Sequence, residues 1–147
     1  MTENSEHSRQ PINMLKVDFV IDPLANDDTR PRVQLSETVS FTLDTMNNIV
    51  SNKFSTLVNR TEPKDYIDFY FLLSQYQQLQ IEDLYESARK KDATFDDPPT
   101  IAYIIEDGIS RVLSDTRLFP AMKKQIDLEG FQNFYSQVSK NIYAMNV

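Results

Sequence analysis

The chain has 147 residues, a usual size for one domain, and its apolar content of 40% favours a folded core over disorder. Its net charge of −7 at pH 7 argues against a broad nucleic-acid footprint, although a local basic pocket is compatible with it. The absence of cysteine excludes disulfides, zinc–cysteine sites and thiol nucleophiles. The single histidine, His7, lies in the N-terminal tail, so we expect no histidine base or Ser-His-Asp triad.

The positions of the glycines and the length of the apolar segments argue against a phosphate-loop protein and against a secreted or membrane-spanning one. The only glycines, Gly108 and Gly130, each lie within a helical pattern, so a glycine-rich phosphate loop is not expected. The N-terminal sequence "MTENSEHSRQP" lacks the apolar region of a signal peptide, and runs such as "FYFLL" are too short to span a bilayer. We therefore expect a cytoplasmic protein that makes no use of a membrane.

The N-terminal third is predicted to form a tail followed by strands. Residues 1–12 are polar and predict a flexible tail, whereas residues 13–147 are expected to form a single domain. Apolar and polar side chains alternate in "NMLKVDFVI" (residues 13–21), which predicts a half-buried strand. "RVQLSETVSFTL" (residues 32–43) alternates again and predicts one or two further strands.

The remaining two thirds of the chain show helical spacing of apolar residues. Asp44 is expected to be the N-cap of the first helix, and Pro63 lies in the first turn of the second. The predicted helices cover residues 45–60, 61–77, about 81–91, about 100–114, and a last segment that starts near Asp127. Strands over about 13–43 followed by helices over about 44–147 predict an α+β fold: short N-terminal antiparallel strands followed by a mostly helical bundle.

Charged residues gather where the first two long helices meet. Lys53 and Arg60 are seven residues apart and therefore lie on one face of the first helix. Asp65 and Asp68 are three apart and are neighbours at the start of the second helix, which also carries Lys64. A short turn would bring these charges together between the two helices. By contrast, we expect the basic run "RKKD" (residues 89–92) to face solvent.

Asp68 lies inside the apolar segment "DYIDFYFLL", so we expect it to be buried and paired with a cation, which we expect to be Arg60. One interpretation is a structural Arg–Asp pair that fixes the helical hairpin. Another is a phosphate-binding site, in which lysine and arginine hold an anion while the carboxylates orient them or a metal. A hydrolase that uses Asp65 and Asp68 is disfavoured, because neighbouring cations stabilise both ionised carboxylates.

Two quoted segments resemble one protein family. "LKVDFV" (residues 15–20) and "NKFSTLVNRTEPKDYIDFYFLL" (residues 52–73) are similar to the later part of AbiEii/AbiGii toxin-type nucleotidyltransferases. In that family, a lysine and an arginine on one helix precede a basic–Asp pair and a second Asp. The matching residues here are Lys53, Arg60, Lys64, Asp65 and Asp68. Residues 115–142 also resemble the family's closing helix, so the resemblance covers roughly residues 13–142.

The resemblance implies nucleotidyl transfer from a nucleoside triphosphate, with magnesium. It implies catalytic roles for Lys53, Asp65 and Asp68, nucleotide binding by Arg60 and Lys64, and metal binding by Asp18. The family belongs to bacterial toxin–antitoxin and phage-defence systems, which implies an antitoxin as partner and an RNA as acceptor.

The sequence departs from the family at its start. The family carries a Gly-Ser turn and a D-x-D pair there, and neither precedes "LKVDFV" in this chain. A lone Asp18, which is equally compatible with a solvent-facing position, cannot hold two magnesium ions. We therefore expect the chain to be incomplete and inactive alone, with the missing segment supplied by a second chain or a longer gene product. The alternative is a non-catalytic structural or binding module.

Overall fold

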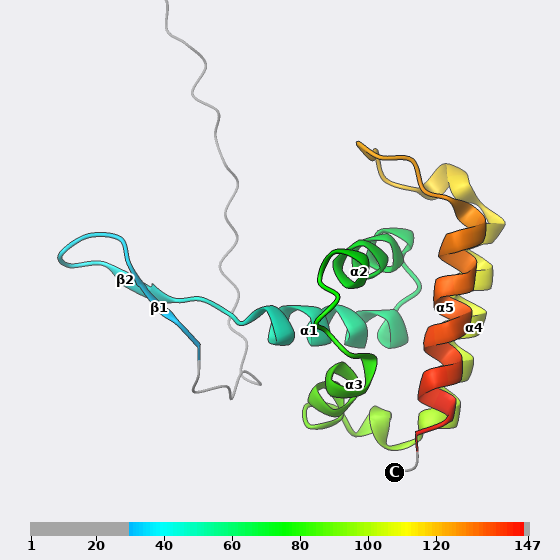
Figure 1. The fold of residues 1–147 in the computed structure, drawn as a ribbon, viewed down its shortest axis with the longest axis horizontal. Helices are drawn as coiled ribbons and strands as arrows, with labels where there is room; N and C mark the ends of the chain where they lie inside the picture. The colour runs from blue at the N-terminus through cyan, green and yellow to red at the C-terminus, as the bar shows by residue number, and fades with distance from the viewer. Residues whose placement is uncertain (1–29, 146–147) are drawn as a thin grey trace, which may run out of the picture.

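The structure, a computed structural model, describes residues 30–145 and shows two short strands followed by helices (Figure 1). The elements are β1 (Arg32–Gln34), β2 (Ser40–Thr42), α1 (Met46–Asn59), α2 (Pro63–Gln75), α3 (Ile81–Arg89), α4 (Pro98–Ser114) and α5 (Leu128–Tyr143), with short 3-10 turns η1 (Ala93–Asp96) and η2 (Thr116–Leu118). This order confirms the predicted α+β class. The strand predicted over residues 13–21 and the predicted tail lie outside the described residues.

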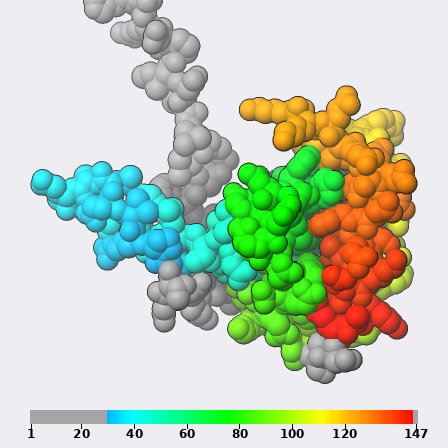
Figure 2. Space-filling model, viewed as in Figure 1, coloured from blue at the N-terminus to red at the C-terminus, as the bar shows by residue number. Residues whose placement is uncertain are grey.

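The strands β1 and β2 form an antiparallel hairpin that extends from the helical body (Figures 1 and 2). Val33 lies opposite Phe41, and Leu35 and Val39 follow on the same side because side chains alternate along a strand. The other side is polar. The apolar side remains largely open, since Leu35 is 66% and Phe41 40% exposed.

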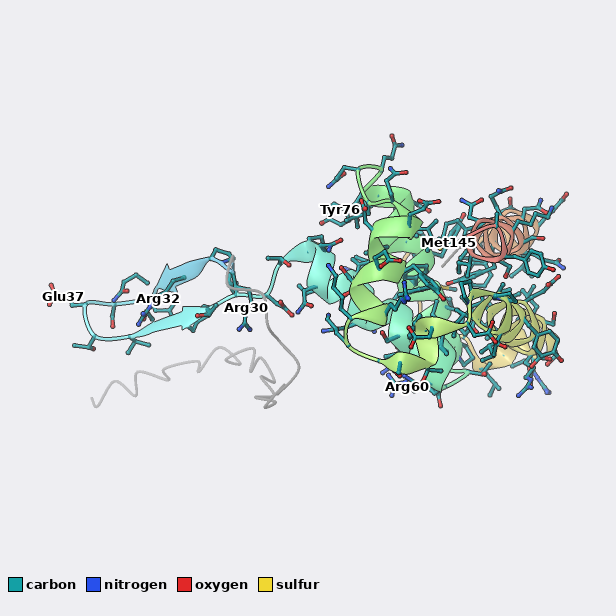
Figure 3. All side chains as sticks on the ribbon, turned by 90° about the horizontal axis from the view of Figure 1, so that it is seen from below. Arg30, Arg32, Glu37, Arg60, Tyr76 and Met145 are labelled. Carbon is teal, nitrogen blue, oxygen red and sulfur yellow. The ribbon has the colours of Figure 1, made fainter. Side chains whose placement is uncertain are left out.

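The core lies between the helices, where α4 and α5 run side by side in opposite directions and α1 lies against α2, α3 and α4 (Figures 1 and 3). The ring of Phe54 on α1 lies 5.5 Å from that of Phe69 on α2 and 5.5 Å from that of Phe95 in η1. These rings are fully buried, so aromatic packing fixes how α2 is rotated against α1.

Side-chain caps define where two of the helices begin. The prediction that Asp44 caps α1 is wrong, because its carboxylate accepts hydrogen bonds from the Asn48 side chain instead. Thr45 takes the capping position and accepts from the backbone N–H of Asn48. Asp127 caps α5 by accepting from the backbone N–H of Gly130, and α5 begins beside Asp127 as predicted.

Helix length bears on any membrane association. The longest helix of residues 30–145, α4, has 17 residues, whereas a bilayer-spanning helix needs about 20 apolar residues. No helix in the described part of the chain is both long and apolar enough to cross a membrane.

Gly108, in the middle of α4, leaves room for the side chain of Tyr66. A Cβ at position 108 would lie 1.9 Å from the hydroxyl oxygen of Tyr66 and 2.8 Å from its Cζ. Glycine in a helix interior costs about 1 kcal/mol relative to alanine, so its presence here follows from this close approach of α2 to α4. Tyr66 itself is fully buried.

We expect Gly108→Ala to lower the free energy of unfolding by about 2 kcal/mol or more, because the added methyl group overpacks a filled core. In a Tyr66→Phe background the cost of Gly108→Ala should be smaller, since the atom at 1.9 Å is then absent. A double-mutant cycle by urea denaturation measures this coupling. Equal costs of Gly108→Ala in both backgrounds would contradict the assigned contact.

Candidate functional site

Asp65 lies in the first turn of α2, and its side chain is fully buried. One carboxylate oxygen, Oδ1, accepts a hydrogen bond from Nζ of Lys53 at 3.1 Å. The other, Oδ2, accepts from Nε of Arg60 at 2.8 Å. A buried carboxylate is stable only when it is paired. Asp65 meets this condition by accepting charge-assisted hydrogen bonds from both Lys53 and Arg60.

Asp68 lies one turn further along α2 and is half-exposed, with 50% of its side chain accessible. Its Oδ2 lies 2.9 Å from Nζ of Lys53. The prediction that Asp68 is the buried carboxylate and pairs with Arg60 is therefore wrong on both counts. Asp65 and Phe69 both face the core. Because an α-helix turns by about 100° per residue, Asp68 lies at the edge of the face that these two residues share. We call Lys53, Arg60, Asp65 and Asp68 the Asp65 cluster.

Lys53 bridges the two carboxylates while 29% of its side chain remains accessible. Partial burial lowers its pKa, but hydrogen bonds to Asp68 and Asp65, together with their negative charges, raise it more. The resulting pKa lies above the ordinary value of 10.5, so Lys53 carries its charge throughout the physiological range. Of the three ammonium hydrogens, one has no acceptor within residues 30–145.

Arg60 ends α1, where its backbone N–H bonds to the carbonyl oxygen of Thr56 at 2.9 Å. Its side chain is 53% exposed and lies at the edge of the helical body (Figure 3). Only Nε has a partner among the described residues, namely Asp65. The hydrogens on Nη1 and Nη2 therefore remain available to an anion, which a guanidinium binds through two parallel hydrogen bonds.

Among the predicted site residues that the structure describes, Lys64 is the one that does not join the cluster. Lys64 follows Pro63 in α2, but its side chain is exposed and forms no ion pair within the described part of the chain. Asp18, predicted to bind metal, lies outside the described residues. The structure thus brings together four of the six predicted residues: Lys53, Arg60, Asp65 and Asp68.

The Asp65 cluster does not fit a magnesium ion. No group of three acidic, histidine or cysteine side chains in residues 30–145 is arranged to hold a metal. Both oxygens of Asp65 are already bound to cations, and Asp68 alone is too few ligands for a hard divalent ion. The arrangement is suited to binding an anion through Arg60 and Lys53.

A second lysine, Lys91, is held on α1 and was not expected there. Its ammonium donates to Ser51 Oγ at 3.0 Å and to Asn52 Oδ1 at 2.7 Å, and also to Asn48 Oδ1. The prediction that "RKKD" faces solvent is therefore wrong at Lys91, which is partly buried. The polar residues Asn48, Ser51 and Asn52 at helical spacing were the signal for this contact.

Asp65→Asn should lower the free energy of unfolding by about 2–3 kcal/mol, because it leaves two neighbouring cations without their shared anion. This is less than the cost of about 3–5 kcal/mol for breaking a fully buried pair, since both cations are partly exposed. Asp68→Asn should cost less than about 1 kcal/mol, as for other exposed pairs. Urea denaturation of both variants tests the order, and a larger loss in Asp68→Asn would contradict the assigned burial.

The raised pKa of Lys53 also predicts how stability depends on pH. A group whose pKa is higher in the folded state contributes its stability fully below the unfolded value, here 10.5, and loses it as pH rises through the folded-state pKa. The difference in unfolding free energy between the wild type and Lys53→Gln should therefore shrink between pH 10 and pH 12. Denaturation at a series of pH values measures it, and a difference that grows with pH would refute the assignment.

Comparison with known proteins gives one match. The family model described as "Nucleotidyl transferase AbiEii toxin, Type IV TA system" matches residues 3–138, which include the whole Asp65 cluster. No curated protein and no solved structure matches the chain significantly. The family match covers most of the sequence and confirms the resemblance found from Lys53, Arg60, Asp65 and Asp68. The chain therefore belongs to the AbiEii nucleotidyl transferase toxin family of type IV toxin–antitoxin systems.

Proposed function

We propose that the Asp65 cluster binds the triphosphate of a nucleoside triphosphate and that the protein takes part in nucleotidyl transfer. The observation that carries the proposal is the free Nη1 and Nη2 edge of Arg60 beside Lys53, with both cations oriented by one buried carboxylate. Phosphoryl-type transfer depends mainly on positioning and charge neutralisation, which this arrangement supplies. Membership of a nucleotidyltransferase family supports the same conclusion.

In the proposed reaction, a hydroxyl oxygen of the acceptor attacks the α-phosphorus of the nucleotide. A new P–O bond forms, the bond to the β-phosphate oxygen breaks, and pyrophosphate leaves with the bonding electron pair. Arg60 and Lys53 stabilise the negative charge on the phosphates. Asp65 orients both cations, and Asp68, whose Oδ1 is free of Lys53, accepts the proton of the attacking hydroxyl.

Other parts of the proposal depend on residues outside the cluster. Magnesium would bind to residues outside the cluster, of which Asp18 is one candidate ligand. A Gly-Ser and D-x-D segment, from another chain or a longer gene product, would complete the enzyme. The exposed Lys64 would attract the nucleotide electrostatically without direct pairing in the cluster.

We extend the proposal to the biological context of the family. A type IV toxin acts in the bacterial cytoplasm, has a cognate antitoxin, and contributes to phage defence. We propose RNA as the acceptor. Since the chain has a net charge of −7, RNA must be bound by a local basic surface and not by the protein as a whole.

A second candidate function is a non-catalytic module in which the cluster only joins α1 to α2. The observation that favours it is that Lys53 and Arg60 already form ion pairs with Asp65 within the protein. The two functions differ in what removal of Lys53 does, because a structural pair affects stability alone whereas a binding site also loses affinity for triphosphate.

Binding of inorganic tripolyphosphate and of each nucleoside triphosphate, measured by isothermal titration calorimetry on the full chain, tests the proposal. We expect Lys53→Ala and Arg60→Ala each to weaken binding by about tenfold to a hundredfold, the loss of one or more charge-assisted hydrogen bonds. Lys64→Ala should weaken it less. Transfer of an α-³²P-labelled nucleotide to RNA then tests the reaction when the D-x-D segment is supplied.

Lys140→Ala is the matched control, because Lys140 is an exposed lysine of α5 and is not part of the Asp65 cluster. This variant removes the same charge and should bind tripolyphosphate as the wild type does. Failure of the wild type to bind tripolyphosphate and nucleotides, with a loss of stability alone in Lys53→Ala, would favour the structural module.

A further inference from the structure

We propose that Tyr135, Tyr66 and Gly108 are positioning residues for the Asp65 cluster, although two of them lie on helices that contribute nothing to it. Tyr66 follows Asp65 in the chain and is the point at which α1, α2, α4 and α5 meet. The effect of these residues on nucleotide binding and transfer rests on the proposed function.

The first contact ties α2 to the end of α1. The hydroxyl of Tyr66 donates to the carbonyl oxygen of Leu57 at 3.3 Å. Leu57 lies in the last turn of α1, where carbonyl groups have no partner within the helix. Tyr66 therefore provides a donor for the carbonyl oxygen of Leu57, in the turn that leads to Arg60. This contact links α2, which carries Asp65 and Asp68, to the end of α1.

The second contact ties α2 to α5. The hydroxyl of Tyr135 donates to the backbone carbonyl of Tyr66 at 2.6 Å, and the two ring centroids lie 5.0 Å apart. Both side chains are fully buried. Burial raises the pKa of Tyr135 well above its usual value, with smaller effects from the neighbouring Tyr66, Asp65 and Asp68, so the hydroxyl remains a donor at all pH values relevant to function.

Gly108 supplies the third contact by admitting the Tyr66 ring against α4, where any Cβ would collide with it. Together the three contacts fix the start of α2 along its axis and against its neighbours. Ion pairs of 2.8–3.1 Å around Asp65 depend on this position. A shift of α2 by about 1 Å would take them beyond hydrogen-bond distance.

Tyr135→Phe tests this inference because it keeps the buried ring and removes only the hydroxyl. The rate at which Lys53 reacts with an amine-specific acylating reagent, followed by peptide mass spectrometry, reports the ion pair directly. We expect Lys53 to react about fivefold faster in Tyr135→Phe, as expected for the loss of about one neutral hydrogen bond. Reaction of Lys140 should not change.

Tyr85→Phe is the matched control for stability. Tyr85 is also fully buried, and its hydroxyl donates to the carbonyl oxygen of Phe95 at 2.5 Å. It has no contact with the Asp65 cluster, so its loss should destabilise the protein while leaving Lys53 reactivity unchanged. Equal Lys53 reactivity in the wild type and Tyr135→Phe would show that Tyr135 is merely structural and would overturn the inference.

Tripolyphosphate affinity separates this inference from the proposed function. If the wild type binds tripolyphosphate, Tyr135→Phe should weaken binding about fivefold and Tyr85→Phe should not. If the wild type does not bind it, the proposed function fails, and Lys53 reactivity still decides whether Tyr135 positions the ion pair. Wild-type affinity in Tyr135→Phe, in a protein that binds tripolyphosphate, would refute the positioning role.

Discussion

The burial of the Asp65 carboxylate is the constraint on which the rest of the described structure depends. An ionised group with no access to water must be compensated on both oxygens, and Lys53 and Arg60 provide that compensation from α1. The turn between α1 and α2 is therefore determined by charge as well as by chain connectivity. Tyr66, the next residue in the chain, lies in the core, where it contacts Gly108 of α4 and Tyr135 of α5.

Much of this arrangement could be predicted from the sequence. Helical spacing of apolar residues gave the helices and their order, and the charges of Lys53, Arg60, Asp65 and Asp68 indicated a meeting point between two of them. Which carboxylate is buried could not be predicted. That choice depends on the rotation of α2, which is fixed by packing of Phe69 on Phe54 and not by any local pattern.

The residues that surround Tyr66 were still less accessible to prediction. Tyr135 is 69 residues away from Tyr66 in the chain, and only the packing of α5 against α2 brings them together. Gly108 carried a signal, because a glycine within a helical pattern indicates a packing requirement. The sequence did not show what Gly108 accommodates. Asp18 and the strand expected around it lie outside the described residues, so those predictions stay predictions.

The two glycines limit how the protein can be stabilised by design. Replacing a helical glycine with alanine is a common way to raise thermal stability. At position 108 the methyl group would enter the space of Tyr66, and at position 130 it would lie 2.7 Å from the capping carboxylate of Asp127. Neither substitution is therefore expected to raise thermal stability without a new steric clash. Exposed helix surfaces and the open side of the hairpin are better places for stabilising substitutions.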